Sequence, residues 1–157
     1  FEVEVAEFLE KVARSQMTEE HSTEVRSMLS ITNDLERIGD LFYQMSKILE
    51  RKEENKDYFF PEQRNNLNDM LDLLDEAFST MNANLKGEYG QVDINEARDL
   101  EKRINKLRNK LRREYHQRIA DGDKNISGSM IYSDIFTQCE KVGDQIINVS
   151  EAVEGSI

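Results

Sequence analysis

The sequence predicts an all-α protein, an antiparallel up-and-down bundle of about five helices that contains an internal helix-pair repeat. Two observations lead to this prediction. Apolar residues recur at three- and four-residue steps along nearly the whole chain, and the sustained apolar–polar alternation typical of strands is absent. Short polar loops between long amphipathic segments make consecutive helices antiparallel neighbours. We expect one domain, residues 1–157, because this length suffices for one continuous core.

The first two helices follow from apolar spacing and from one start signal. Phe1, Val5 and Phe8 open the first helix, and Thr18 before two glutamates is a typical helix N-cap for the second. The apolar stripe of this second helix consists of Met28, Ile31, Leu35, Ile38, Phe42, Met45 and Leu49. It ends in the charged stretch that precedes the only proline, Pro61.

The remaining three helices have their own boundary signals. Pro61 suits the first turn of a third helix, where its missing N–H has no consequence. Asp93 and Glu96 have the spacing of a capping box for a fourth helix, which Gly122 ends. A fifth helix follows, with Ile131, Ile135, Val142, Ile146, Val149 and Val153 facing inward. We expect the core to include Ile38, Phe42, Leu74, Phe78, Leu107, Leu111, Val142 and Ile146.

An internal repeat appears because Glu-x-x-Gly-Asp occurs twice, at 36–40 and at 140–144. Aligning the segments before the two motifs pairs Glu2 with Glu101 and divides the chain into repeat 1, about 1–86, and repeat 2, about 93–157. Glycine inside a helix costs roughly 1 kcal/mol relative to alanine. We therefore predict that a neighbouring helix approaches closely at both Gly39 and Gly143.

The acidic residues of each motif lie on the side of the helix turned away from the apolar stripe. Carboxylates four residues apart repel each other unless a cation lies between them. Glu140 and Asp144, with Glu101 and Asn105 from the preceding helix, predict a site for a hard cation such as Mg²⁺, Ca²⁺, Mn²⁺ or iron. The alternative, an ordinary solvated acidic face, stays open.

Charge excludes one class of partner and suggests another. The chain holds 21 Lys and Arg against 32 Asp and Glu, a net charge of −11, which argues against nucleic-acid binding. The segment 98–118 is the exception, because it is rich in Lys and Arg. Either it packs among acidic neighbours, or its exposed Arg108, Arg112 and Arg113 dock onto anionic lipid head groups or an acidic partner.

Other site chemistry is absent from the sequence. No Gly-rich phosphate loop, Cys/His metal spacing or nucleophile motif occurs, so we expect no enzymatic activity and no organic cofactor. Neither His21 nor His116 has a glutamate three residues before it, which argues against a di-iron bundle and assigns both to surface or cap positions. The single cysteine, Cys139, fits a reducing compartment. No apolar run is long enough for a transmembrane segment.

"DLERIGD" in the second helix and "EKVGD" in the fifth resemble the PhoU-like family of phosphate-homeostasis proteins, over nearly the whole chain. The resemblance implies repeated three-helix bundles with acidic motifs on facing helices and metal ions on the acidic surface. It assigns Glu36 and Asp40 to the first motif, with Glu2 as their partner, in a weaker metal site. The site is weaker because Ala6 stands where a second acid is needed. Five helices instead of six indicate a trimmed member.

The resemblance is strongest to the soluble C-terminal domains of bacterial sodium/phosphate symporters, and a chain that begins at Phe1 fits an excised tail. It implies a regulatory domain in phosphate homeostasis, cytoplasmic and at the inner face of the membrane. The partner would be a membrane phosphate transporter, in cis or in trans. A standalone phosphate-signalling regulator and a metal-free helical interaction module are the alternatives, and a homo-oligomer is a further expectation.

Overall fold

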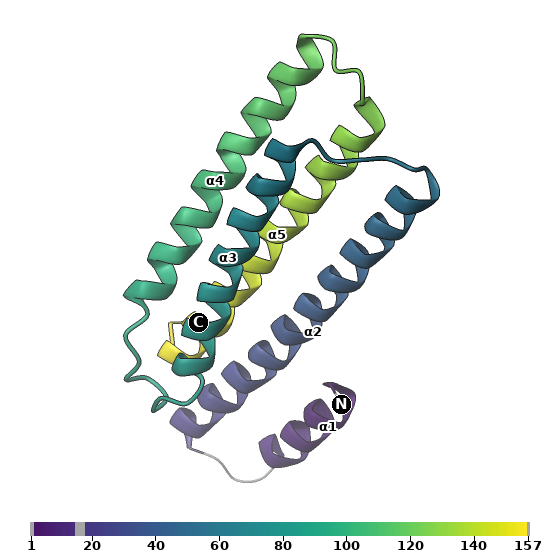
Figure 1. Ribbon diagram of the computed structural model, residues 1–157. Coiled ribbons are helices and arrows are strands. Elements are labelled where there is room, and N and C mark those ends of the chain that lie inside the picture. Colours follow the sequence, from purple (N-terminus) through teal and green to yellow (C-terminus); the bar gives the residue numbers. More distant parts are fainter. Residues whose placement is uncertain (1, 15–17, 157) are drawn as a thin grey trace.

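The computed structural model describes residues 2–14 and 18–156, and these form five α-helices with no strand among them. The prediction of an all-α bundle is therefore confirmed. Consecutive helices run in opposite directions along the bundle (Figure 1). The five helices are α1 Glu2–Ala13, α2 Glu19–Glu54, α3 Pro61–Asn84, α4 Asn95–Ala120 and α5 Ile126–Glu154.

Most helix boundaries follow the sequence signals, and one differs. Thr18 caps α2, because its side-chain oxygen accepts a hydrogen bond from the His21 N–H at 3.3 Å. Pro61 is the first residue of α3, and Gly122, with a φ of +84°, follows the last turn of α4. The Asp93 capping box is wrong: α4 begins at Asn95, and the Asp93 carboxylate accepts from the Asn95 N–H at 2.9 Å. Asp93 thus makes a local turn before the helix.

Helix α5 is the centre of the bundle. It packs against α2, α3 and α4, while α3 also packs against α4, and α1 contacts α2 (Figure 1). The predicted apolar stripe of α5 is buried along its whole length. Cys139 lies in the same core, and burial raises the pKa of its thiol to about 11, so the thiol stays protonated at neutral pH.

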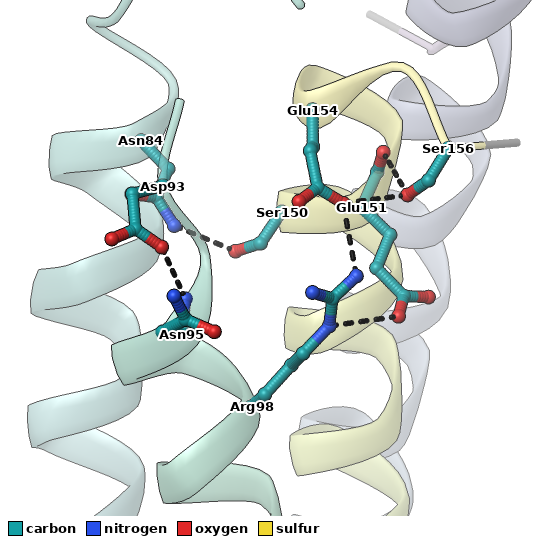
Figure 2. Close-up of polar contacts among 8 residues, drawn as sticks. All are labelled: Asn84, Asp93, Asn95, Arg98, Ser150, Glu151, Glu154 and Ser156. Carbon is teal, nitrogen blue, oxygen red and sulfur yellow. Dashed lines mark hydrogen bonds and ion pairs between the residues drawn. The ribbon is translucent and has the colours of Figure 1, made fainter. Parts of the chain in front are cut away.

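Polar contacts hold the end of the bundle where α3, α4 and α5 meet (Figure 2). Asn84 at the end of α3 donates to the hydroxyl of Ser150 on α5 at 3.2 Å, and both residues are buried. Arg98 on α4 reaches between two glutamates of α5, with its guanidinium 3.0 Å from Glu154 and 3.9 Å from Glu151. These contacts set the register in which α4 and α5 face each other.

The core prediction is correct except at Phe42 on α2. Ile38, Leu74, Leu111, Val142 and Ile146 are buried. Phe78 and Leu107 are partly buried and pack against the core. Phe42, predicted as a core residue, is 41% exposed, and its ring stacks on Phe78 with 6.1 Å between centroids. The prediction fails there because α2 packs closely against α5 and α1 but not against α3, which contributes the Phe78 ring that stacks on Phe42.

None of the described helices combines the length and the apolar character needed to cross a bilayer. This agrees with the expectation from the sequence for this part of the chain.

Candidate functional site

The first acidic motif lies on an exposed surface of α2. Glu36 and Asp40 are both exposed, as predicted. Their mutual repulsion is visible in the pKa of Glu36, which is raised first by the charge of Asp40, with a smaller contribution from Glu2 on α1. The three carboxylates of the weaker predicted site are therefore near enough to influence one another.

The second motif lies between α4 and α5 and is less exposed than expected. The exposed fraction of the Glu140 side chain is only 14%, because Arg108 on α4 lies against it and donates a hydrogen bond to its carboxylate. The Arg108 side chain is itself 22% exposed. The sequence places both acids of this motif on the outside, and the structure places them in the seam between two helices.

The four residues of the stronger predicted site do converge in this seam. Asn105 donates to the Glu101 carboxylate at 3.0 Å, one turn along α4. The pKa of Asp144 is raised, first by burial and then by the charges of Glu140 and Glu101. Arg108 opposes this rise. Three carboxylates therefore share one partly buried region that contains a single guanidinium.

The oxygen donors here are of the kind that hard cations prefer, and the side-chain oxygen of Asn105 is buried without a hydrogen-bond partner. Their spacing is less favourable. Among the described residues, no group of three or more Asp, Glu, His and Cys side chains is arranged to hold a metal ion. Arg108 already supplies a positive charge to Glu140, so a metal ion using that carboxylate competes with Arg108 for it.

The two motif glycines differ in what surrounds them. A Cβ on Gly143 would meet the Ile104 side chain at 3.1 Å and 3.2 Å, which confirms the predicted close approach of a neighbouring helix. A Cβ on Gly39 would meet nothing within 4 Å. The prediction for Gly39 is therefore wrong, because α1 does not approach α2 at that level.

Several basic side chains of helix α4 form ion pairs with acidic neighbours. Arg103 pairs with Glu76 at 2.9 Å, and Arg118 pairs with Glu62 at 3.0 Å. Of the three arginines predicted to dock partners or lipids, Arg108 is engaged with Glu140, while Arg112 and Arg113 are exposed. Arg112 and Arg113 line two different cavities, so the three do not form one docking face.

Arg108 is the site residue whose role the sequence reasoning missed. Ile104 on α4 lies against Gly143 on α5, so in the antiparallel arrangement Arg108, one turn further along α4, lies level with Glu140, about one turn back along α5. Given the close approach predicted at Gly143, this spacing is the sequence signal that could have found Arg108. Arg108 therefore supplies a positively charged side chain within the acidic seam.

Comparison of the chain with protein-family models, with curated proteins and with solved structures gave no match.

Proposed function

We propose that this chain is a non-enzymatic regulatory domain in phosphate homeostasis, and that it forms the cytoplasmic tail of a sodium-dependent phosphate cotransporter. The observation that carries the proposal is the duplicated helix pair with its Glu-x-x-Gly-Asp motifs. In each copy the first helix brings a glutamate, Glu2 or Glu101, near the acids of the second. This pattern is what the resemblance to the PhoU-like family rests on.

The proposal includes a divalent cation or iron at the seam, with Glu101, Asn105, Glu140 and Asp144 as the donor set. These residues supply carboxylate and amide oxygens to a hard ion. Arg108 makes the site conditional, because its pairing with Glu140 competes with the metal. Glu36 and Asp40 are exposed and Glu2 is half-buried, so this second set offers a weaker, more screened site.

A metal-binding test separates this proposal from a metal-free interaction module. Mn²⁺ and Mg²⁺ should raise the melting temperature of the purified chain, and EDTA should reverse the rise, because an ion bound only by the folded state stabilises it. Asp144→Asn should abolish the rise, and Asp40→Asn should leave most of it. A melting temperature that responds to neither ions nor EDTA would establish the metal-free module.

A transport assay tests the regulatory role itself. Cells that express the complete protein should take up radiolabelled phosphate at an altered rate when Glu101→Gln and Asp144→Asn are combined, while immunoblots show unchanged protein level. Asp69→Asn, on the exposed acidic face of α3, serves as the matched control. Unchanged uptake by the double variant contradicts the proposal. Reading the gene upstream of Phe1 for membrane-spanning segments separates a transporter tail from a standalone regulator.

A further inference from the structure

A small polar cavity lies between α4 and α5, next to the acidic seam. Its volume is about 260 Å³. Helix α4 contributes two arginines, a tyrosine and a histidine, and α5 contributes two hydroxyl residues, a phenylalanine and a glutamate. The lining residues are Arg108, Arg112, Tyr115, His116, Ser133, Phe136, Thr137 and Glu140.

Several hydrogen-bond donors that line the cavity have no acceptor among the described residues. The Nε of Arg108 is buried and has no acceptor. Arg112 forms no ion pair with any described residue, although four other arginines of α4 do. The hydroxyls of Ser133 and Thr137 likewise make no hydrogen bond to the described residues. A buried guanidinium N–H without an acceptor is costly, which indicates a missing partner that accepts hydrogen bonds.

The register of the two helices places these donors opposite one another. Arg108 meets Glu140, and Arg112 lies one turn further along α4 while Thr137 lies about one turn back along α5. His116 and Ser133 occupy the next level. The donors thus form two facing rows that converge on one cavity, with Phe136 as its apolar wall.

The charge of the cavity selects an anion. Two guanidinium groups outweigh the single carboxylate of Glu140, which already accepts from the terminal nitrogen of Arg108. A guanidinium has five donors in a planar fork, so Arg108 can keep one terminal nitrogen on Glu140 and still have N–H donors left for a ligand in the cavity. Paired arginines with hydroxyl donors are well suited to the oxygens of a phosphate group.

We propose that this cavity binds a phosphate oxyanion, either inorganic phosphate or the phosphate monoester head group of an anionic lipid. The guanidinium groups of Arg108 and Arg112 bind the oxyanion charge, and Thr137 and Ser133 donate hydrogen bonds to its remaining oxygens. The site would exist whether or not the chain regulates transport, since its residues and donors are independent of that role.

Calorimetry on the purified chain tests the site with two neighbouring arginines. Inorganic phosphate should bind saturably in constant ionic strength, and Arg112→Ala should weaken it about tenfold or more, because a charge-assisted hydrogen bond is lost. Arg113→Ala is the matched control, as this exposed residue lines a different cavity, and it should change the affinity less than about twofold. Thr137→Val, which keeps the side-chain shape, should weaken binding by a smaller factor than Arg112→Ala.

Vesicle flotation identifies the source of the phosphate group. Phosphatidylcholine vesicles with phosphatidic acid should retain the chain only if the head group reaches the cavity, and Arg112→Ala should release it. Binding of inorganic phosphate alone assigns a soluble ligand, and binding of vesicles alone assigns a lipid. Equal losses in Arg112→Ala and Arg113→Ala would mean general charge attraction and would overturn the proposal. Absence of binding to both probes would overturn it as well.

Discussion

One row of equivalent positions is apolar on both α5 and α2 but differs greatly in exposure between the two helices. On α5, Cys139, Ile146 and Val153 are exposed by 0%, 2% and 6%. Their equivalents on α2, Leu35, Phe42 and Leu49, are exposed by 40%, 41% and 45%. The two sets occupy matching places relative to the Glu-x-x-Gly-Asp motifs and repeat every seven residues.

The difference comes from the helix that covers one face and not the other. Helix α3 packs against both α5 and α4, and no described helix packs in the same way against both α2 and α1. The apolar stripe therefore indicates which side of a helix is suited to burial. Whether that side is buried depends on a neighbour elsewhere in the chain, which the local pattern does not contain.

The largest expected effect comes from truncating the equivalent residues Ile146 and Phe42. Ile146→Ala should lower the free energy of unfolding by about 2 to 5 kcal/mol, because it leaves a cavity in a filled core. Phe42→Ala should cost only about 1 to 2 kcal/mol, since its ring is 41% exposed and keeps mainly its stacking on Phe78. Urea unfolding followed by circular dichroism measures both.

Equal losses of unfolding free energy in Ile146→Ala and Phe42→Ala would contradict the difference between α5 and α2. They would mean that the α2 face is covered in solution, and light scattering at several protein concentrations would then show whether a second copy covers it. A monomeric chain with a costly Phe42→Ala would instead show that the face is buried within one chain.

Helix positions were predictable because each helix has local signals, including Thr18 at the start of α2 and Pro61 at the start of α3. Helix phase was predictable wherever a helix is covered on its apolar side, as along α5. The exposure of Phe42 was not predictable, because the apolar stripe that contains it has the same spacing as a buried stripe. Asp93 was misassigned because a carboxylate before a helix can cap it or make a turn, and spacing alone does not distinguish these.

The glycines of the two motifs give the second expected effect. Gly143→Leu should lower the free energy of unfolding by about 1 to 3 kcal/mol, since the new side chain meets Ile104, already 3.1 Å from the Cβ position. Gly39→Leu should raise it by up to about 1 kcal/mol, because helix propensity improves and nothing lies within 4 Å. Thermal unfolding of both variants measures the contrast. A stabilised Gly143→Leu chain would show that α4 yields easily at this contact.

The candidate site was predictable as a set of residues but not as an environment. The repeat brought Glu101, Asn105, Glu140 and Asp144 together correctly, because antiparallel helices of one register place them at one level. The repeat could not show that the acids of the motif between α4 and α5 are half-buried while the acids of the motif on α2 are exposed. That difference arises from the same unequal covering of α5 and α2, and it gives the two copies different titration behaviour.

The smallest expected effect compares Asp144→Asn with Glu36→Gln as pH and salt are varied. The folded-state pKa is raised at both residues, first by burial at Asp144 and first by the charge of Asp40 at Glu36. Between the ordinary carboxyl pKa of about 4 and the raised value, the folded state binds more protons than the unfolded state. Stability therefore falls as pH rises through that window, and at neutral pH both ionised carboxylates are unfavourable.

Each variant should melt slightly above the parent at pH 7, and the difference should shrink towards zero as pH falls below about 4, where the parent is protonated too. Salt should separate the variants. The gain from Glu36→Gln should fade near 1 M NaCl, where exposed charges are screened within about 3 Å. The gain from Asp144→Asn should persist, because salt does not remove a cost of burial. Melting curves at pH 4 and pH 7, with and without salt, measure both. If the gain from Asp144→Asn also disappears in salt, then repulsion from Glu140 and Glu101 outweighs burial, and the two motifs differ less than their exposure indicates.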